Sequence, residues 1–115
     1  YDATMKYLSK VDADWVGSHL ELEGFEMMRG VTNTHGMSKN TFKRFECVMS
    51  GHFHTKSAQD NIHYLGSQFE FTWADANDPK YFHIIDTETR KIVKIRNNHT
   101  LFEKVLYNDE EIDYK

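Results

Sequence analysis

The sequence is poor in cysteine, in proline and in long apolar runs, and each scarcity excludes a class of protein. It contains one cysteine, Cys47, so no disulfide can form within the chain and a reducing compartment is expected. It has one proline and no tract rich in glycine and serine, so nothing marks a linker between two domains. Its apolar runs are only a few residues long, far below the roughly 20 residues of a membrane-spanning helix. We therefore expect one continuous unit with no transmembrane segment.

An excess of positive charge is also missing. Fourteen Lys and Arg residues stand against eighteen Asp and Glu, for a formal net charge of −4. No global basic field would therefore attract nucleic acid or anionic lipid, although local basic patches remain open. The chain begins at Tyr1, and its opening segment lacks the basic start and apolar centre of a signal peptide. We expect a fragment or processed product that is cytoplasmic.

Aromatic residues, by contrast, are abundant, at 14% of the chain. Such rings supply the buried area that offsets chain entropy, so the chain is expected to fold. A length of 115 residues is enough for one compact domain or a piece of a larger one, and not for two cores.

The first half of the chain predicts helix, strand, loop, helix and strand in that order. Apolar residues at helical spacing indicate a helix over residues 2–10, and alternation over residues 11–16 indicates a strand. Ser38 is placed to cap a second short helix that carries two phenylalanines on one face. The apolar run 47–50 then predicts a buried strand, in which Cys47 is an inert thiol.

The second half predicts an antiparallel meander. Short β-branched or aromatic segments alternate with clusters of turn-forming residues, at 61–65, 69–73, 82–86, 91–95 and 102–107. The coarse architecture is therefore α/β, with short helices first and an antiparallel strand meander after. We expect the larger aromatic side chains to pack in the core rather than to form a base-stacking platform, namely Trp15, Phe69, Phe71 and Trp73.

The residues suited to chemistry are histidines. His52 and His54 follow the strand 47–50 directly, in Gly51-His52-Phe53-His54. In an extended segment, residues two apart point to the same face, and Gly51 gives the backbone freedom to turn at the strand end. This spacing suits a metal site, although His-x-His by itself is also common in polar loops.

A second predicted strand also ends on a histidine, His19. Ligands gather outside the carboxyl ends of strands in α/β sheets, so we expect His19, His52 and His54 to converge on one site. Three imidazoles suit zinc, iron, manganese or cobalt better than calcium.

These motifs carry a family resemblance. Gly51-His52-Phe53-His54, with Val48-Met49-Ser50 before it and Thr55-Lys56-Ser57 after it, resembles the last metal motif of the calcineurin-like metallophosphoesterases. Residues 19–25 resemble the preceding histidine motif of the DNA-repair nuclease branch, and residues 61–78 and 82–88 resemble its following strands. Within this branch the chain is similar to SbcD-like nucleases and to recombination endonuclease subunits of T-even bacteriophages. The likeness runs roughly from residue 14 to residue 107.

The resemblance implies a fold and an activity. Residues 1–115 are expected to be a single partial domain, the C-terminal half of a four-layer α/β/β/α metallophosphoesterase sandwich. The implied activity is metal-dependent DNA cleavage, endonucleolytic or exonucleolytic, in recombination or repair. Two divalent ions, Mn²⁺ or Mg²⁺, would support phosphodiester hydrolysis. His19 and His52 match ligands of one ion and His54 matches a ligand of the other.

The resemblance also implies partners: DNA, an SMC-like ATPase subunit, and a second copy of the chain as a further candidate. The location would be the host cytoplasm if the protein is phage-encoded.

The family's earlier motifs are absent from these residues. The chain has no Asp-x-His, no Gly-Asp with its bridging aspartate and no Gly-Asn-His, and Ser18 stands where family members more often have glycine. We therefore expect weak metal affinity and no turnover from these 115 residues alone. Two other functions stay open: a general phosphodiesterase or phosphatase, and a non-catalytic half-domain that serves as an interaction module.

Several polar residues have a structural interpretation. Asn98-His99 is expected to be a turn, and His35, His63 and His83 are expected to have loop, packing or surface roles. A small basic cluster on the second helix is expected to be a solvated face, with phosphate contact as the alternative: Lys39, Lys43 and Arg44.

Overall fold

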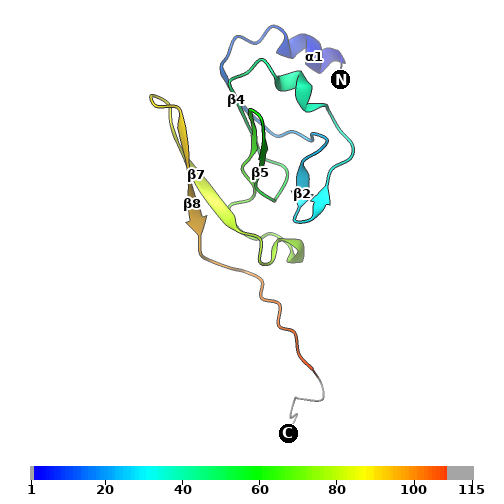
Figure 1. The fold of residues 1–115 in the computed structure, drawn as a ribbon, viewed down its shortest axis with the longest axis vertical. Helices are drawn as coiled ribbons and strands as arrows, with labels where there is room; N and C mark the ends of the chain where they lie inside the picture. The colour runs from blue at the N-terminus through cyan, green and yellow to red at the C-terminus, as the bar shows by residue number, and fades with distance from the viewer. Residues whose placement is uncertain (1, 109–115) are drawn as a thin grey trace.

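The computed structural model describes residues 2–108. Short helices and strands follow one another along the chain and are joined by short loops (Figure 1). In order they are α1 (Asp2–Leu8), β1 (Trp15–Ser18), β2 (Glu26–Met28), β3 (Val31–Thr32), η1 (Lys39–Phe42), β4 (Cys47–Ser50), β5 (Ser57–Gln59), β6 (Ile62–Tyr64), η2 (Trp73–Asp75), β7 (Lys80–Asp86) and β8 (Lys91–Asn97).

The main sheet has four strands in the order β1-β4-β6-β5. Strands β1, β4 and β6 are parallel to each other, and β5 is antiparallel to β6. Residues 61–65 were predicted to pair antiparallel. The prediction is confirmed for the pairing of β6 with β5 and is wrong for its pairing with β4. The reason lies in the connection: β5 carries the chain back from the end of β4, and a turn at Asp60, with φ of 53°, reverses it into β6.

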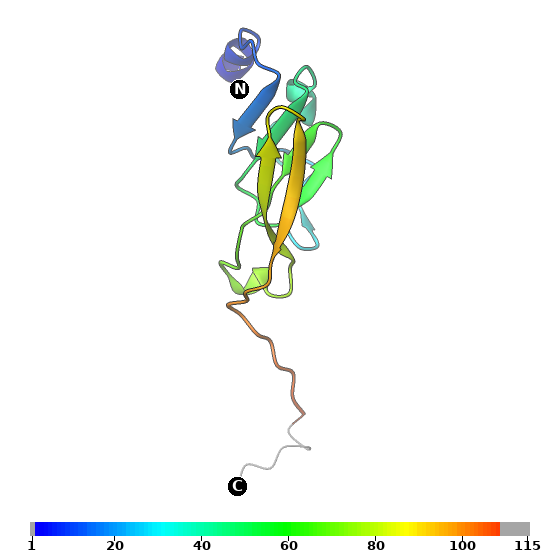
Figure 2. The same cartoon turned by 90° about the vertical axis from the view of Figure 1, so that its left-hand side faces the viewer.

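A long hairpin forms a second layer. Strands β7 and β8 pair antiparallel over their full lengths, from Lys80 opposite Asn97 to Asp86 opposite Lys91. Figures 1 and 2 show this hairpin lying beside the four-stranded sheet. The strands predicted at 82–86 and 91–95 are thus confirmed. A small hairpin of β2 and β3, in the region expected to be a loop, and strand β5 were not predicted.

Two predicted strands are wrong. Residues 69–73 form no strand, because the Asp75 carboxylate accepts hydrogen bonds from the backbone N–H groups of Phe71 and Thr72 and the chain turns into η2. Residues 102–107 pair with no strand among the described residues, and the chain leaves the body there (Figure 1). The expected core role fails for three aromatics with substantial exposed fractions, Phe69 at 42%, Phe71 at 54% and Trp73 at 59%.

The elements of the first half agree better with the prediction. Helix α1 is present, Ser38 Oγ accepts a hydrogen bond from the Asn40 N–H at the start of η1, and β4 lies where expected. Strand β1 starts at Trp15, later than predicted, and the Trp15 side chain is half-buried. Cys47 is buried as predicted, and burial, together with the nearby charge of Glu46, raises the pKa of its thiol.

The basic cluster near η1 has protein partners. Lys39 Nζ bonds Asp60 Oδ2 at 3.0 Å and Gln59 Oε1 at 3.1 Å. The Arg44 guanidinium donates to the Leu8 and Val11 carbonyls and lies over the Phe45 ring, 4.4 Å from its centroid. These contacts tie η1 and the residues after it to their neighbours, so Lys39 and Arg44 have protein partners and do not form the solvated face that was expected.

The core fills the space on one side of the main sheet. Its buried members include Val48 and Ile62, which are opposite each other in the sheet, and the ring of Tyr64. The Phe53 ring stacks on the Tyr64 ring with centroids 4.6 Å apart. The complete set is Leu22, Phe25, Phe42, Phe45, Val48, Phe53, Ile62 and Tyr64.

The described residues thus provide a four-stranded sheet and a neighbouring hairpin layer. The four-layer sandwich and the single partial domain stay predictions. No helix within residues 2–108 has the length and apolar character to cross a membrane.

The hydroxyl of Tyr64 offers a test of how the loop after β1 is held. Tyr64 Oη accepts a hydrogen bond from the Leu22 N–H at 3.1 Å and donates to the Leu20 carbonyl at 2.9 Å, in a side chain with no exposed surface. Tyr64→Phe should lower the free energy of unfolding by about 1–3 kcal/mol, because the buried Leu22 N–H loses its partner. Urea denaturation of the whole protein measures this change.

The matched control is Tyr81→Phe on β7. The Tyr81 hydroxyl has no protein hydrogen-bond partner among residues 2–108, so this change should stay within about 0.5 kcal/mol. Equal effects of the two substitutions would contradict the role assigned to Tyr64.

Candidate metal centre

His19 and His52 meet at one edge of the main sheet. Strands β1 and β4 are parallel and in register, with Ser18 opposite Ser50, so both strands end at the same edge. The Gly51 N–H donates to the Ser18 carbonyl at 3.1 Å, which extends the pairing by one residue. The two imidazole rings that follow have centroids 5.0 Å apart in an edge-to-face arrangement.

Buried hydroxyl groups fix the backbone next to His19. Ser50 Oγ accepts a hydrogen bond from the Leu20 N–H at 2.8 Å, and Ser18 Oγ donates to the Met49 carbonyl at 2.9 Å. Tyr64 Oη donates to the Leu20 carbonyl. Burial raises the pKa of Tyr64, so its hydroxyl remains protonated and able to donate. The loop that carries His19 is therefore anchored to β4 and β6.

Gly51 is needed for the close approach of the His19 ring. A Cβ atom built on Gly51 would lie 3.1 Å from Nδ1 and 3.6 Å from Cε1 of His19. The equivalent atom on Gly17, in the neighbouring strand, would have no heavy atom within 4 Å. Glycine at position 51 therefore leaves room for an imidazole against the backbone of the Gly-His-x-His motif.

The backbone at His52 lies in the left-handed region, with φ of 83°. A residue with a Cβ atom adopts this conformation at a cost of roughly 1–2 kcal/mol. Non-glycine residues in such conformations gather at functional sites, where the surrounding structure holds them in place. Here the turn at His52 ends β4 and leaves the imidazole exposed beside His19.

His54 lies on the same side of the motif as His52. The intervening Phe53 side chain is buried in the core, while His52 and His54 line one pocket of about 240 Å³ together with Met27 and Thr72. The His54 N–H donates to the Met27 carbonyl at 3.1 Å. The two histidines thus share a pocket as their spacing predicts, although the segment that carries them is a loop and not a strand.

A buried carboxylate fixes the orientation of the His54 ring. Nδ1 of His54 lies 3.2 Å from Oδ2 and 3.3 Å from Oδ1 of Asp75, whose exposed fraction is 1%. An ionised carboxylate only accepts hydrogen bonds, so Nδ1 carries the proton. In the neutral imidazole the lone pair is then on Nε2, which is the atom free to bind a metal.

Asp75 is ionised because several donors surround it. Burial by itself raises the pKa of the Asp75 carboxyl, but the N–H groups of Phe71 and Thr72 donate to it at 2.8 Å and 3.1 Å. Lys80 and His54 lower the pKa further, and the net shift is downward. The carboxylate is thus a fixed acceptor at neutral pH.

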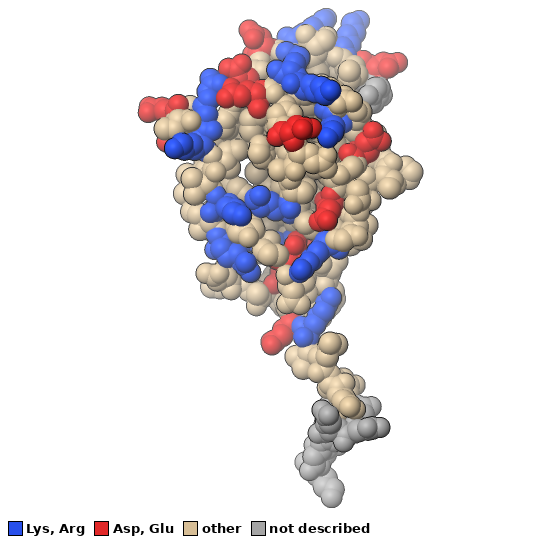
Figure 3. All heavy atoms as spheres, in the orientation of Figure 1, with Lys and Arg blue, Asp and Glu red and all other residues tan. Residues whose placement is uncertain are grey.

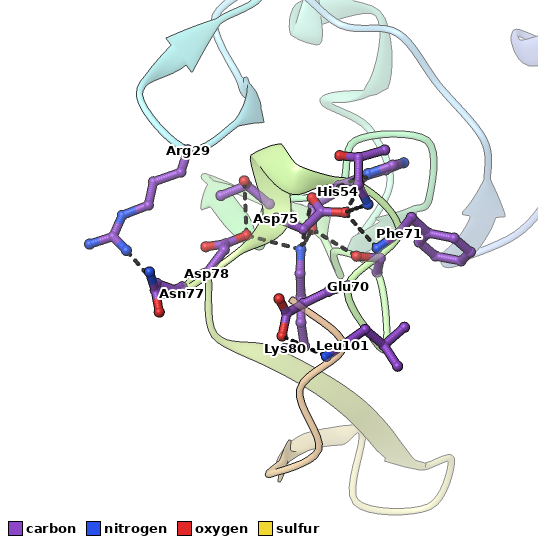
Figure 4. A network of polar contacts seen from close by, with 12 residues as sticks. Arg29, His54, Glu70, Phe71, Asp75, Asn77, Asp78, Lys80 and Leu101 are labelled. Carbon is purple, nitrogen blue, oxygen red and sulfur yellow. Dashed lines mark hydrogen bonds and ion pairs between the residues drawn. The ribbon is translucent and has the colours of Figure 1, made fainter. Parts of the chain in front are cut away.

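Lys80 and Asp78 complete a buried charged cluster around His54 (Figure 4). Lys80 Nζ lies 2.7 Å from the His54 carbonyl oxygen, 3.0 Å from Asp78 Oδ2 and 3.5 Å from Asp75 Oδ1. Thr55 Oγ1 donates to Asp78 Oδ2 at 3.1 Å. One lysine thus faces two carboxylates, and this excess negative charge beside His54 favours a cation there.

The structure divides the three predicted ligands into a pair and a single residue. It pairs His19 with His52 and places His54 against Asp75, and within residues 2–108 no three metal-ligating side chains form a group that could hold a metal ion. The ligand assignment therefore stays a prediction.

Sequence reasoning missed the residues that support these histidines. Asp75 and Asp78 lie in one of the clusters of turn-forming residues, and neither the aspartates nor Lys80 stand out by sequence as partners of a histidine. The spacing Thr72-x-x-Asp75 resembles a helix-capping motif and was the available signal that Asp75 binds backbone N–H groups. Nothing in the sequence indicates that the same carboxylate also binds His54.

Comparison with known proteins gives one informative similarity. The chain is 36% identical over 112 residues to the protein named exonuclease subunit 1 of Enterobacteria phage T4. The match covers 96% of this chain and 33% of that protein, so the chain spans about a third of its relative's length. No protein-family model matches the chain. No solved structure matches it either.

The contact between Gly51 and His19 can be tested by adding a methyl group at position 51. Gly51→Ala should shift the His19 ring by a few tenths of an ångström, because the new methyl group would otherwise lie too close to Nδ1. Since His19 is exposed and free to move, the free energy of unfolding should change by less than about 1 kcal/mol. Imidazole NMR resonances of His19 measure the shift. Gly17→Ala is the matched control, and an equal shift in both variants would refute the contact.

The role of Asp75 predicts a specific change in His54. Asp75→Asn places an amide beside Nδ1, and an amide N–H that faces Nδ1 moves the ring proton to Nε2. ¹⁵N spectra of the His54 ring should therefore report the opposite tautomer, and metal affinity of the whole protein should fall about 10- to 100-fold. The loss of one carboxylate facing Lys80 should also lower stability by roughly 1–3 kcal/mol.

Asp86→Asn is the matched control. Asp86 Oδ1 also accepts two backbone N–H groups, from Glu88 and Thr89, at 2.9 Å and 3.0 Å, but it has no histidine partner within residues 2–108. The Asp86→Asn variant should therefore keep the His54 spectrum and the metal affinity of the unmodified protein. An unaltered His54 tautomer in Asp75→Asn would show that Asp75 does not position the ring.

Proposed function

We propose that this chain forms the C-terminal part of the catalytic domain of a metal-dependent DNA nuclease. The observation that carries the proposal is the meeting of His19 and His52, from two parallel strands, at 5.0 Å between ring centroids. His54, oriented by Asp75 in the adjoining pocket, adds a second ligand position. The similarity to a phage exonuclease subunit supports a nuclease rather than another hydrolase.

The donor set fits divalent transition metals. The imidazoles of His19 and His52 are exposed and adjacent, and Nε2 of His54 has its lone pair available because Nδ1 is bound to Asp75. Imidazole nitrogen suits manganese, iron, cobalt or zinc, and the excess negative charge of Asp75 and Asp78 over Lys80 favours a cation nearby. We infer that His19 and His52 serve one ion and His54 a second ion, with Mn²⁺ the expected metal.

The residues of this chain have distinct tasks in such a centre. When bound, the metal ions would polarise the phosphodiester and lower the pKa of an attacking water. Asp75 keeps the proton on Nδ1 of His54, and Lys80 keeps the Asp75 carboxylate in place. Gly51 leaves room for the His19 ring, and Ser50 and Tyr64 hold the loop behind it. The chain thereby supplies nitrogen ligands on an anchored backbone, with the ring of His54 oriented by Asp75.

The remaining ligands would come from outside these residues. The chain spans about a third of its relative's length, and we propose that a bridging carboxylate and further ligands come from other parts of the whole protein. Because the relative is named a subunit, we propose that the whole protein also works in a complex. An SMC-like ATPase is the partner that the sequence resemblance favours, and DNA is the substrate.

The proposal predicts the effect of removing one ligand from the whole protein. His52→Ala and His52→Gly should each reduce Mn²⁺-dependent DNA cleavage at least 100-fold, because the pair of imidazoles is lost. His52→Gly should be at least as stable as His52→Ala, since glycine adopts the positive φ at this position without strain. Nuclease assays and thermal denaturation of both variants measure these effects.

His99→Ala is the control, because His99 is exposed just after β8 and lies outside the pocket that His52 and His54 line. It should keep full activity and normal metal affinity. Full Mn²⁺-dependent cleavage by both His52 variants would overturn the assignment. Cleavage of a small phosphodiester but not of DNA would favour the general phosphodiesterase instead.

A further inference from the structure

A second pocket lies between the main sheet and the hairpin. It has a volume of about 260 Å³, and basic side chains dominate its lining. His63 comes from β6, His83 from β7 and Lys94 from β8, while Lys56 lies in the loop before β5. No aspartate or glutamate lines it within residues 2–108. Four basic groups from four segments of the chain therefore surround one cavity.

The two lysines of this pocket have no acidic partner among the described residues. Neither Lys56 nor Lys94 forms an ion pair within residues 2–108. Lys94 Nζ instead lies over the Tyr81 ring, 4.9 Å from its centroid, with the Arg96 guanidinium at 5.9 Å from the same ring. On the face drawn in Figure 3, Lys and Arg side chains gather over the region of β8. Positive charge at this pocket is thus uncompensated.

One imidazole nitrogen in the pocket also lacks a partner. Nε2 of His83 is buried and makes no hydrogen bond within the described part of the chain. A buried polar atom without a partner costs about 1–3 kcal/mol, so a ligand that bonds it would recover this energy. Burial, then the charges of Lys56, Lys94 and His63, lower the pKa of His83. A nearby anion would oppose the effect of those charges.

The carboxylate of Asp78, which lines an adjoining pocket, already has hydrogen-bond partners. Asp78 lines an adjoining pocket together with Lys56, Tyr81 and Lys94, but its carboxylate is bound by Lys80 at 3.0 Å and by Thr55 at 3.1 Å. It therefore does not compete for the lysines as a free anion would.

We propose that the pocket formed by Lys56, His63, His83 and Lys94 binds a phosphate group. Ammonium and imidazole N–H groups are strong donors to phosphate oxygens, and a cleft lined by charges of one sign concentrates ions of the other sign. The phosphate belongs either to a DNA backbone or to a free phosphate ion, which share the same recognition chemistry. The site is separate from the metal centre and does not depend on it.

The test uses the whole protein with a metal chelator present, so that no bound metal takes up phosphate. Isothermal titration with inorganic phosphate at constant ionic strength gives the first affinity. Binding of a DNA duplex over a series of salt concentrations gives the second, together with its salt dependence. The variants are Lys94→Gln and His83→Gln. The control is Lys91→Gln, which removes the same charge from an exposed position at the other end of β8.

Lys94→Gln should weaken phosphate binding roughly tenfold or more, because a charge-assisted hydrogen bond is lost, and His83→Gln should weaken it to a smaller degree. Lys91→Gln should have no effect. If DNA is the source of the phosphate, Lys94→Gln should also lower the slope of log K against log salt by about one, and an unchanged slope would identify free phosphate.

The proposal is overturned if neither phosphate affinity nor the DNA salt slope distinguishes Lys94→Gln from Lys91→Gln. Because Lys94 is exposed, its replacement should not unfold the protein, and thermal denaturation of all variants checks this point.

Discussion

The buried carboxylate of Asp75 is the interaction on which the candidate site depends. It accepts two backbone N–H groups at the start of η2, lies beside the ammonium of Lys80 at the start of β7, and binds Nδ1 of His54. A buried charge is stable only when such partners surround it, and each partner is thereby held in place. One carboxylate thus connects the loop that carries His54 to the hairpin layer and determines which nitrogen of His54 is free.

The pairing of β1 with β4 provides the second constraint. Parallel strands in register end at the same edge, so the residues just beyond Ser18 and Ser50 are brought together. Two details then place the rings: the absence of a side chain at Gly51 and the left-handed backbone at His52. Neither detail contributes to the core. The motif therefore combines a strained backbone with a rigid sheet, as expected where position matters more than local stability.

Opposite charge environments lie close together in the sequence around residues 54–56. His54 faces Asp75, and the carboxylates of Asp75 and Asp78 outnumber the positive charge of Lys80, their common partner. Lys56, two residues later, lines a cavity with His63, His83 and Lys94 and without a carboxylate. The first environment favours a cation and the second an anion. The proposed nuclease function would use both kinds of ligand, since it requires metal ions and phosphate groups.

The sequence correctly predicts the positions of the first helix, of β4 and of the hairpin β7–β8, because local periodicity and turn residues specify them. It also identified His19, His52 and His54 as candidate ligands, through their places after apolar strands. Three features could be seen only in the folded chain: β6 runs parallel to β4, residues 69–73 turn into η2, and Asp75 and Lys80 support His54. These features depend on contacts between residues distant in sequence, which no local pattern encodes. The cavity lined by His63 and His83 likewise could not be predicted from the sequence. These two histidines lie in separate strands and come together only when the sheet and the hairpin pack against each other.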